Sequence, residues 1–240
     1  MEQAELRKAV DLLWGDVTPR QRRGPRQRIA LADVVRAGVA VAERDGWTAL
    51  SMQRVAEEAG VTANALYTYV PSKAVLVQLL ADAVTPAEPP LVQGDATLGE
   101  RLEVWALAMW DVLMAHPWLL KAPAPIPPVG PNQLRWFQAL LSTLRDSGLA
   151  AGEVLSLGMF VLASVRGQAA VAVEQHAPGV RGYLDVAGTV VTHARLPVMY
   201  ELFLEMFAGN PRQGWSGSQD LTFGLRTMVA GVHAYVAART

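Results

Sequence analysis

Residues 50–73 read LSMQRVAEEAGVTANALYTYVPSK. Three hydroxyl side chains in and beside this stretch each precede a helical run, where such an oxygen can accept a backbone N–H group as an N-cap. Gly60 ends the first run, and Pro71 prevents the second from continuing. The predicted helices are therefore 52–59 after Ser51, a very short one from Thr62 to about Val70, and one from Lys73 to about Val84 after Ser72.

The first two of these helices carry apolar residues that are spaced to pack the pair together at a steep angle. This arrangement is a helix-turn-helix, in which the second helix enters the major groove of DNA. It predicts double-stranded DNA as a partner. The packing residues are Val55, Ala56, Ala59, Val61 and Leu66, on both sides of a tight turn at Gly60.

The remaining positions of this motif have side chains that suit a nucleic acid. Small residues allow close approach to base edges and thymine methyl groups, and amides can make paired hydrogen bonds with adenine. Hydroxyls, a cation and a helix N-terminus suit phosphates. The alternative is that the two tyrosines are half-buried packing residues and that the asparagine is ordinary surface. The candidates are Gln53, Ala63, Asn64, Ala65 and Thr68 for bases, and Thr62, Tyr67, Tyr69 and Lys73 for phosphates.

The charge distribution adds a basic segment before the motif. A net charge of −1 for the whole chain argues at first against a nucleic-acid partner. Residues 1–80 nevertheless carry +2, whereas residues 81–240 carry −3. A flexible arm rich in arginine can lie along phosphates or in the minor groove, and the alternative is a solvated linker. The arginines of this arm are Arg20, Arg22, Arg23, Arg26 and Arg28.

The block 29–84 resembles the DNA-binding region of the TetR family of bacterial transcriptional regulators. The resemblance extends to segments that are similar to the C-terminal domain of tetracycline-repressor relatives. In the N-terminal block it lies in Gly46-Trp47-x-Ala49-Leu50-Ser51-Met52-x-x-Val55-Ala56, Ala59-Gly60-Val61, Leu66-Tyr67-x-Tyr69-Val70 and Lys73; in the C-terminal part it lies in Gly130-Pro131-Asn132, Ser147-Gly148-Leu149, Leu221-Thr222-Phe223-Gly224-Leu225-Arg226 and Gly231.

The resemblance implies a role for each matched position and a two-fold dimer on a near-palindromic operator. Half-sites would then lie one helical turn or more apart, about 34 Å or longer. Tyr69-Val70 departs from the His-Phe or His-Val that the family often has, so the phosphate contact from this ring is expected to differ. The resemblance implies that Gln53, Ala63 and Asn64 face bases and that Ser51, Thr62, Ala65, Tyr67, Tyr69 and Lys73 line the phosphate backbone.

Helical periodicity continues along the chain, so we predict an all-α fold. The predicted domains are an N-terminal helix and basic arm (1–28), a three-helix helix-turn-helix DNA-binding domain (29–72) and a helical effector-binding and dimerisation domain (73–240). Helices 152–175 and 218–238 are apolar around much of their circumference, which predicts a homodimer with a helical-bundle interface. The other predicted helices are 3–14, 31–44, 98–115, 132–146 and 196–207.

Aromatic and methionine side chains gather in the second part of the chain and suit an adaptable apolar pocket. The alternative is a plain helical core, and Arg166 could pair with a ligand carboxylate, hydroxyl or carbonyl or make an ion pair across the dimer. The Pro-rich segment 121–131 is a candidate lid. The candidate effector contacts are Trp105, Met109, Trp110, Leu113, His116, Trp136, Phe137, Leu141, Met159, Arg166 and Gln168.

Composition excludes several classes of protein. The 240 residues include no cysteine, which removes disulfides, thiolate nucleophiles and cysteine-based zinc sites. The apolar run between Glu153 and Arg166 is too short to cross a bilayer, and the polar N-terminus lacks a signal peptide, so we expect a cytoplasmic protein with no membrane partner. No metal ion or cofactor is predicted, and His116 is poorly placed for a tetracycline-type magnesium site.

These features predict a regulator, most simply a repressor that a small apolar or aromatic effector releases from a palindromic operator. Effector binding would shift the helix that starts at Lys73 and alter the spacing of the two reading heads. One alternative is a helix-turn-helix regulator without a small-molecule effector. Another is an all-α enzyme, which the scattered histidines and the absence of a phosphate-cradling glycine motif disfavour.

Overall fold

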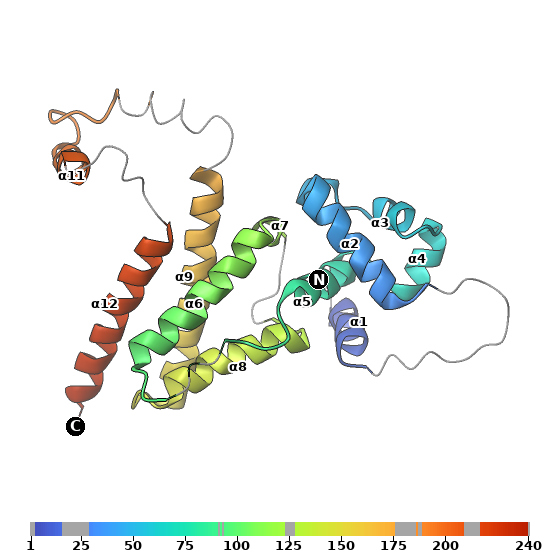
Figure 1. The fold of residues 1–240 in the computed structure, drawn as a ribbon, viewed down its shortest axis with the longest axis horizontal. Helices are drawn as coiled ribbons and strands as arrows, with labels where there is room; N and C mark the ends of the chain where they lie inside the picture. Colours follow the sequence, from blue (N-terminus) through green and yellow to red (C-terminus); the bar gives the residue numbers. More distant parts are fainter. Residues whose placement is uncertain are drawn as a thin grey trace.

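The structure is a computed structural model that describes residues 3–15, 29–90, 92, 94–122, 128–175, 186, 189–208 and 217–239. Every regular element in these ranges is a helix, which confirms the predicted all-α fold (Figure 1). The predicted helices agree with the observed ones to within about one residue at each end. The N-terminal elements are α1 (Gln3–Trp14), α2 (Leu31–Asp45), the 3-10 helix η1 (Trp47–Ala49), α3 (Met52–Glu58), α4 (Ala63–Tyr69) and α5 (Lys73–Val84).

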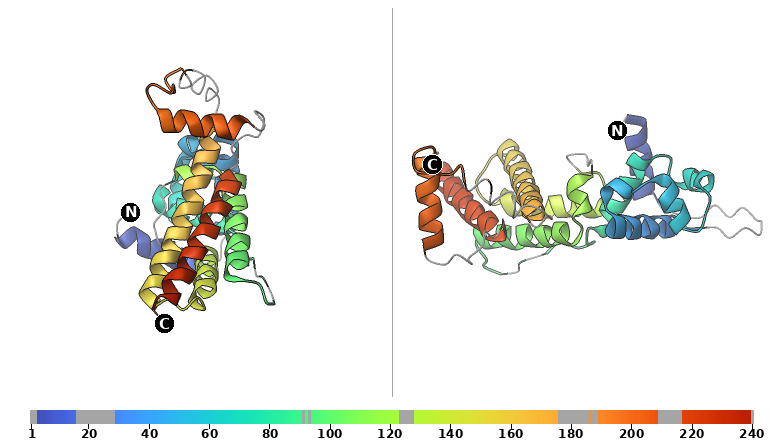
Figure 2. Two further views of the ribbon diagram at one scale, coloured as in Figure 1. Left: turned by 90° about the vertical axis from the view of Figure 1, so that its left-hand side faces the viewer. Right: turned by 90° about the horizontal axis from the view of Figure 1, so that it is seen from above.

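The C-terminal part is a bundle in which α9 packs against α6, α8 and α12 (Figure 2). Helix α11 stands apart from this bundle, at the end of the molecule away from α3 and α4 (Figures 1 and 2). The elements are α6 (Leu98–Ala115), α7 (Trp118–Lys121), α8 (Pro131–Arg145), α9 (Ala151–Gln175), α11 (Pro197–Ala208) and α12 (Gly217–Ala237).

Local capping explains why the three helices α3, α4 and α5 begin where they do. Each predicted N-cap hydroxyl accepts a backbone N–H group from the first turn of its helix, which confirms the predicted helix starts. The pairs are Ser51 Oγ with Arg54 N (3.2 Å), Thr62 Oγ1 with Ala65 N (3.2 Å) and Ser72 Oγ with Val75 N (3.3 Å).

Helix α5 is the central element that joins the two parts. It packs against α1, α2 and α8, and most of its residues are buried. Gly38 of α2 allows close contact, because a Cβ atom there would lie 2.7 Å from Leu80 Cδ2. A displacement of α5 would therefore be felt both by the helix-turn-helix and by the C-terminal bundle.

Helix α9 is long and apolar enough, by length and composition alone, to cross a membrane. Its buried residues Val154, Val161 and Val165 instead belong to the core of the bundle. Leu155 and Phe160 on the same helix are exposed, at 52% and 59% of their surface. Leu155 and Phe160 are therefore apolar residues of α9 that packing within one chain does not cover.

Candidate DNA-binding surface and effector cavity

Helices α3 and α4 meet at one end of the molecule (Figure 1). Of the predicted packing residues, Val55, Ala56 and Leu66 are buried, and Ala59 and Val61 are half-buried. Gly60 connects the helices with a φ of +69°, in the left-handed region that favours glycine. The turn and the buried contact leave the opposite side of α4 open to solvent.

The predicted DNA contacts occupy this open side to different degrees. The Asn64 side chain is exposed, and within the described residues its amide makes no hydrogen bond. Exposed candidates are Gln53, Thr62, Asn64, Tyr67 and Thr68, and half-buried ones are Ser51, Ala63, Ala65, Tyr69 and Lys73. The arm candidates Arg22, Arg23, Arg26 and Arg28, with Arg20, lie outside the described residues.

Several of these side chains are held in place by neighbours. The Lys73 Nζ atom lies 4.3 Å from the centroid of the Trp47 ring, a cation–π distance that keeps the ammonium beside the motif. Gln53 Nε2 donates a hydrogen bond to Glu57 Oε1 at 3.0 Å. The capping hydroxyls of Ser51 and Thr62 accept backbone N–H groups, so their own protons remain free to be donated to phosphates.

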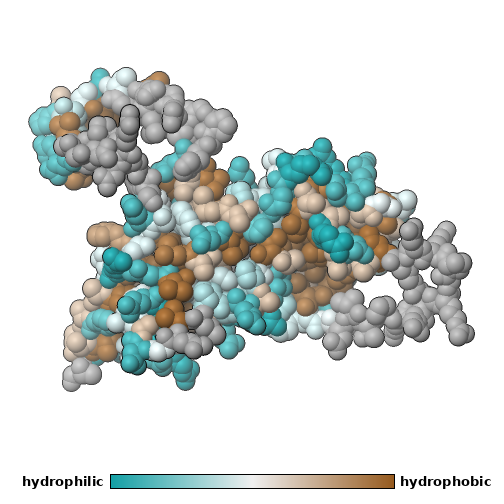
Figure 3. Space-filling model, viewed as in Figure 1, coloured by the Kyte–Doolittle hydropathy of each residue, from teal (hydrophilic) through white to brown (hydrophobic). Residues whose placement is uncertain are grey.

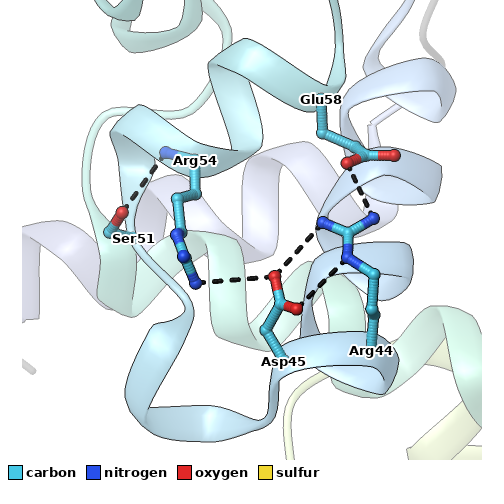
Figure 4. A network of polar contacts seen from close by, with 5 residues as sticks. All are labelled: Arg44, Asp45, Ser51, Arg54 and Glu58. Carbon is cyan, nitrogen blue, oxygen red and sulfur yellow. Dashed lines mark hydrogen bonds and ion pairs between the residues drawn. The ribbon is translucent and has the colours of Figure 1, made fainter.

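A network of charged side chains fixes α3 against the end of α2 (Figure 4). Arg44 Nη1 contacts Glu58 Oε2 at 3.0 Å and Arg44 Nη2 contacts Asp45 Oδ2 at 3.2 Å. Hydrogen bonds to Asp45 and then to Glu58 raise the pKa of Arg44. Arg54 Nη1 reaches Asp45 Oδ2 at 3.5 Å. Exposed ion pairs add little stability individually. These contacts join the end of α2 to Arg54 and Glu58 of α3.

A cavity of about 70 Å³ lies between α5, α6, α7, α8 and α9. Its walls are mainly aromatic and aliphatic. Six of the predicted effector contacts line it: Trp105, Met109, Leu113, Trp136, Phe137 and Arg166. The lining residues that sequence reasoning did not select are Val77, Ala81, Thr85, Val112, Leu119, Ala122, Pro128, Gln133 and Leu162.

The other five predicted contacts are not among the lining residues of this cavity. Trp110 lies under Gly217, where an added Cβ would meet its ring at 2.6 Å, and Leu141 packs at Gly158 in the same way. His116 contacts the DNA-binding part, where its Nδ1 atom lies 2.6 Å from Glu43 Oε1. Met159 and Gln168 are half-buried on α9 without reaching the lining.

Some polar groups of the cavity have hydrogen-bond partners within the described residues, and others do not. The indole N–H groups of Trp105 and Trp136 donate to the carbonyls of Trp136 and Pro86, at 2.9 and 2.8 Å. Arg166 donates to the Leu119 carbonyl at 3.2 Å, and burial lowers its pKa. Gln133 Oε1 is buried and accepts no hydrogen bond within the described residues. Within the described residues, the guanidinium therefore has N–H groups without an acceptor, and the buried amide oxygen has no donor.

Carboxylates of α2 and α5 make polar contacts with two of the other helices that line the cavity. Glu43 Oε1, at the end of α2, accepts the indole N–H of Trp118 at 2.8 Å as well as contacting His116. Asp82 Oδ1, on α5, accepts the backbone N–H groups of Asn132 and Gln133 at 2.9 and 3.0 Å. The first contact joins α2 to α7, and the second joins α5 to the start of α8.

Two known protein families match successive parts of the chain. Residues 34–80 match the family described as "Bacterial regulatory proteins, tetR family", and residues 89–236 match "Tetracyclin repressor-like, C-terminal domain". The chain is 31% identical over 237 residues to the HTH-type transcriptional repressor DrrR1 of Streptomyces coeruleorubidus, covering 94% of this chain and 87% of that protein. It is 28% identical over 202 residues to an HTH-type transcriptional regulator of Saccharopolyspora erythraea, covering 84% and 83%.

Solved structures show the same fold at lower sequence identity. The Streptomyces coelicolor TetR family protein ActR in complex with (S)-DNPA is similar with a TM-score of 0.72 and 21% identity, covering 88% of this chain and 100% of that one. ActR in complex with actinorhodin gives a TM-score of 0.71 at 20% identity, covering 88% and 99%. This likeness concerns the arrangement of the helices.

Proposed function

The chain belongs to the tetR family of bacterial regulatory proteins, and we propose that it works as a homodimeric repressor released from its operator by an aromatic effector. As a family member it is a DNA-binding transcriptional regulator rather than an enzyme. The observation that carries the mechanism is the position of α5. Three residues separate this helix from the end of α4, and it lines the cavity through Val77 and Ala81, with Thr85 directly after its last residue.

The exposed side of α4 is the proposed reading surface. Asn64 is its free amide and pairs with a base edge, while Tyr67 and Lys73 contact phosphates on either side. Ala63, Ala65 and the other small or hydroxyl positions allow the helix to approach closely. The proposed division into DNA-binding and effector domains lies at 72/73, at the start of α5.

Replacing Asn64 by alanine should relax the choice of base at one position of each half-site. Loss of a paired amide contact removes about 1–3 kcal/mol of discrimination in each half-site, which is about a 5- to 150-fold loss of affinity per half-site on the preferred operator. Tyr67→Phe should instead weaken binding to all sequences by a similar factor. Electrophoretic shifts at fixed salt, on the DNA upstream of the chain's own gene and on single-base variants of it, measure both effects. An unchanged base preference in Asn64→Ala would remove Asn64 from the reading surface, and no retardation of any upstream palindrome by the wild type would overturn the proposed operator.

The effector is proposed to act by displacing the wall of the cavity. A volume of about 70 Å³ holds a few water molecules but not an aromatic ligand of several rings. Entry of such a ligand therefore has to displace lining side chains or a wall helix. Because α5 is both a wall and the continuation of the helix-turn-helix, its movement changes the spacing of the two reading heads. A coupling of about 1–3 kcal/mol is enough to change operator affinity about 5- to 150-fold.

The contact of Glu43 with His116 and Trp118 gives the effector a second route to the DNA-binding part. Leu119, which follows Trp118, lines the cavity and its carbonyl holds Arg166. A ligand that engages Arg166 acts on α7 and so on the carboxylate at the end of α2. Glu43 is the shared polar contact between α7 and α2, so this route can be tested by a mutation of Glu43.

Glu43→Gln should uncouple the two parts while leaving the reading surface intact. The neutral amide accepts hydrogen bonds less strongly than a carboxylate, so α7 can shift without carrying α2. Operator affinity without effector should stay close to wild type, and release by a bound aromatic compound should fall to less than about threefold. Fluorescence anisotropy with labelled operator measures both quantities. Glu58→Gln is the matched control, since Glu58 bonds Arg44 within the DNA-binding part; equal losses of release in the two variants would contradict the route.

A homodimer is proposed from the apolar surface that α9, α11 and α12 leave uncovered. On the face that Figure 3 shows, hydrophobic and hydrophilic side chains are intermixed over α12. A groove between α9 and α12 is lined by Leu157, Phe160 and Met228, and Phe223 of α12 is 74% exposed. Contiguous apolar surface of this kind marks an interaction site. Pairing of α9 and α12 with the same helices of a second copy would bury this apolar surface and would set the distance between the two reading heads. The proposed location of the dimer is the cytoplasm.

A further inference from the structure

The polar groups of the cavity restrict the chemistry of its ligand. We infer that the effector is an aromatic acid, whose carboxylate pairs with Arg166 and whose hydroxyl or other donor reaches Gln133. Its rings lie against Trp105, Trp136 and Phe137. This inference deepens the proposed function and rests on it, because a ligand class has meaning only if the cavity binds an effector.

Arg166 is a charge that the described part of the protein leaves uncompensated. A guanidinium has five N–H donors and stays protonated in proteins, and here one donor is accepted by the Leu119 carbonyl. Among the described residues no carboxylate lies within ion-pair distance of Arg166, although burial already lowers its pKa. Residues 123–127, which lie outside the described residues, read PAPIP and include no acid.

An anionic oxygen satisfies this group better than a neutral one. A carboxylate can accept two parallel N–H bonds from the guanidinium fork and neutralises its charge in an apolar surrounding. A neutral carbonyl accepts the hydrogen bonds but leaves the net charge buried, which is unfavourable. The aromatic walls supply apolar contact without competing polar groups, because both indole N–H groups already have carbonyl partners.

Gln133 adds a requirement at a second point of the ligand. Its buried Oε1 atom accepts no hydrogen bond, and its backbone N–H is taken by Asp82. A ligand hydroxyl would satisfy the amide oxygen, whereas an apolar ligand edge would leave it unpaired. The ligand is therefore expected to have an acid group and a separate hydrogen-bond donor on one planar body.

Matched pairs of aromatic acids and their primary amides test the inference on the full-length protein. Suitable pairs are 6-hydroxy-2-naphthoate with 6-hydroxy-2-naphthamide, and anthraquinone-2-carboxylate with its carboxamide; 2-naphthoate lacks the hydroxyl. Calorimetric titration should show the acid of each pair binding about ten- to a hundredfold tighter than its amide. Arg166→Gln should reduce this ratio to less than about threefold, and Arg166→Lys should retain part of it. Gln133→Leu should remove the advantage of the hydroxylated naphthoate over 2-naphthoate.

The outcomes separate the inference from the proposed function. Equal binding of acids and amides by the wild type, or an unchanged ratio in Arg166→Gln, would overturn the acid assignment while the effector cavity stands. Binding of no compound from either series would contradict the cavity as an effector site and the inference with it. A purely structural Arg166 would change the free energy of unfolding and not the acid-to-amide ratio. Loss of the dimer in Arg166→Gln together with an unchanged ratio would assign the arginine to an ion pair across the interface.

Discussion

Phe160→Glu should convert the protein to a monomer and lower its operator affinity by about a hundredfold or more. Phe160 is 59% exposed and lines the apolar groove between α9 and α12. A carboxylate there would have to be buried without a partner when two copies meet, which strongly disfavours the interface. Two linked reading heads gain about 10²- to 10⁴-fold in avidity over a single head, and the monomer forfeits that gain. Sedimentation equilibrium and operator titration measure the two effects.

Val104→Glu is the matched control for this substitution. Val104 is also an exposed apolar residue, at 41%, but it lies on α6 and outside the groove. Because both side chains face solvent in the single chain, neither substitution should change the free energy of unfolding of the single chain by more than about 0.5 kcal/mol, apart from the association free energy that Phe160→Glu loses with the dimer. The control should remain a dimer with wild-type operator affinity. A dimer that survives Phe160→Glu, or a wild type that is monomeric, would refute the proposed interface.

Local chemistry made the helix starts of the DNA-binding part predictable. Ser51, Thr62 and Ser72 act within three residues of themselves, so their roles can be read from neighbouring sequence alone. The short elements η1 and α7 were not predicted, since three or four residues show no periodicity. Helix α7 exists because of contacts with distant parts of the chain, notably Trp118 with Glu43.

The cavity was predictable in composition but only partly in geometry. Residues 105, 109, 112 and 113 share one side of α6, whereas Trp110 is turned by about 140° from Trp105. Trp110 therefore packs toward Gly217 rather than into the cavity. The prediction selected aromatic residues by their type and did not include Val77, Ala81 and Thr85. The sequence of α5 is that of an ordinary buried helix, so it does not indicate that this helix lines a cavity.

Contacts between distant residues account for the rest. The polar link from Glu43 to His116 joins positions 73 residues apart, and that from Asp82 to Asn132 joins positions 50 apart. No spacing in the sequence indicates either pair. His116, which composition placed near a ligand, is held instead by a carboxylate of the DNA-binding part.

Asp82→Ala should lower the free energy of unfolding by about 2–4 kcal/mol. The start of α8 has no side-chain cap of its own, and Asp82 from α5 replaces it by accepting the N–H groups of Asn132 and Gln133. Alanine would leave two partly buried donors without an acceptor and would open space beside Gly130, where an added Cβ would overlap the carboxylate. Denaturant unfolding measures the loss, and Gly130→Ala should produce a comparable one by steric overlap.

Thr97→Ala is the control, because Thr97 Oγ1 caps the exposed start of α6 in the same chemical manner. Its loss should be about 1 kcal/mol, and equal losses in the two variants would show that burial and the link between helices add nothing to the Asp82 cap.

Asp82→Asn isolates the effect of the carboxylate charge. Burial raises the pKa of Asp82 in spite of the N–H groups of Gln133 and Asn132, so the folded protein holds this proton more tightly than the unfolded chain does. The stability of the wild type relative to Asp82→Asn should therefore be greatest below the unfolded pKa and should fall as the pH rises through the folded one, because ionisation of a buried carboxyl opposes folding.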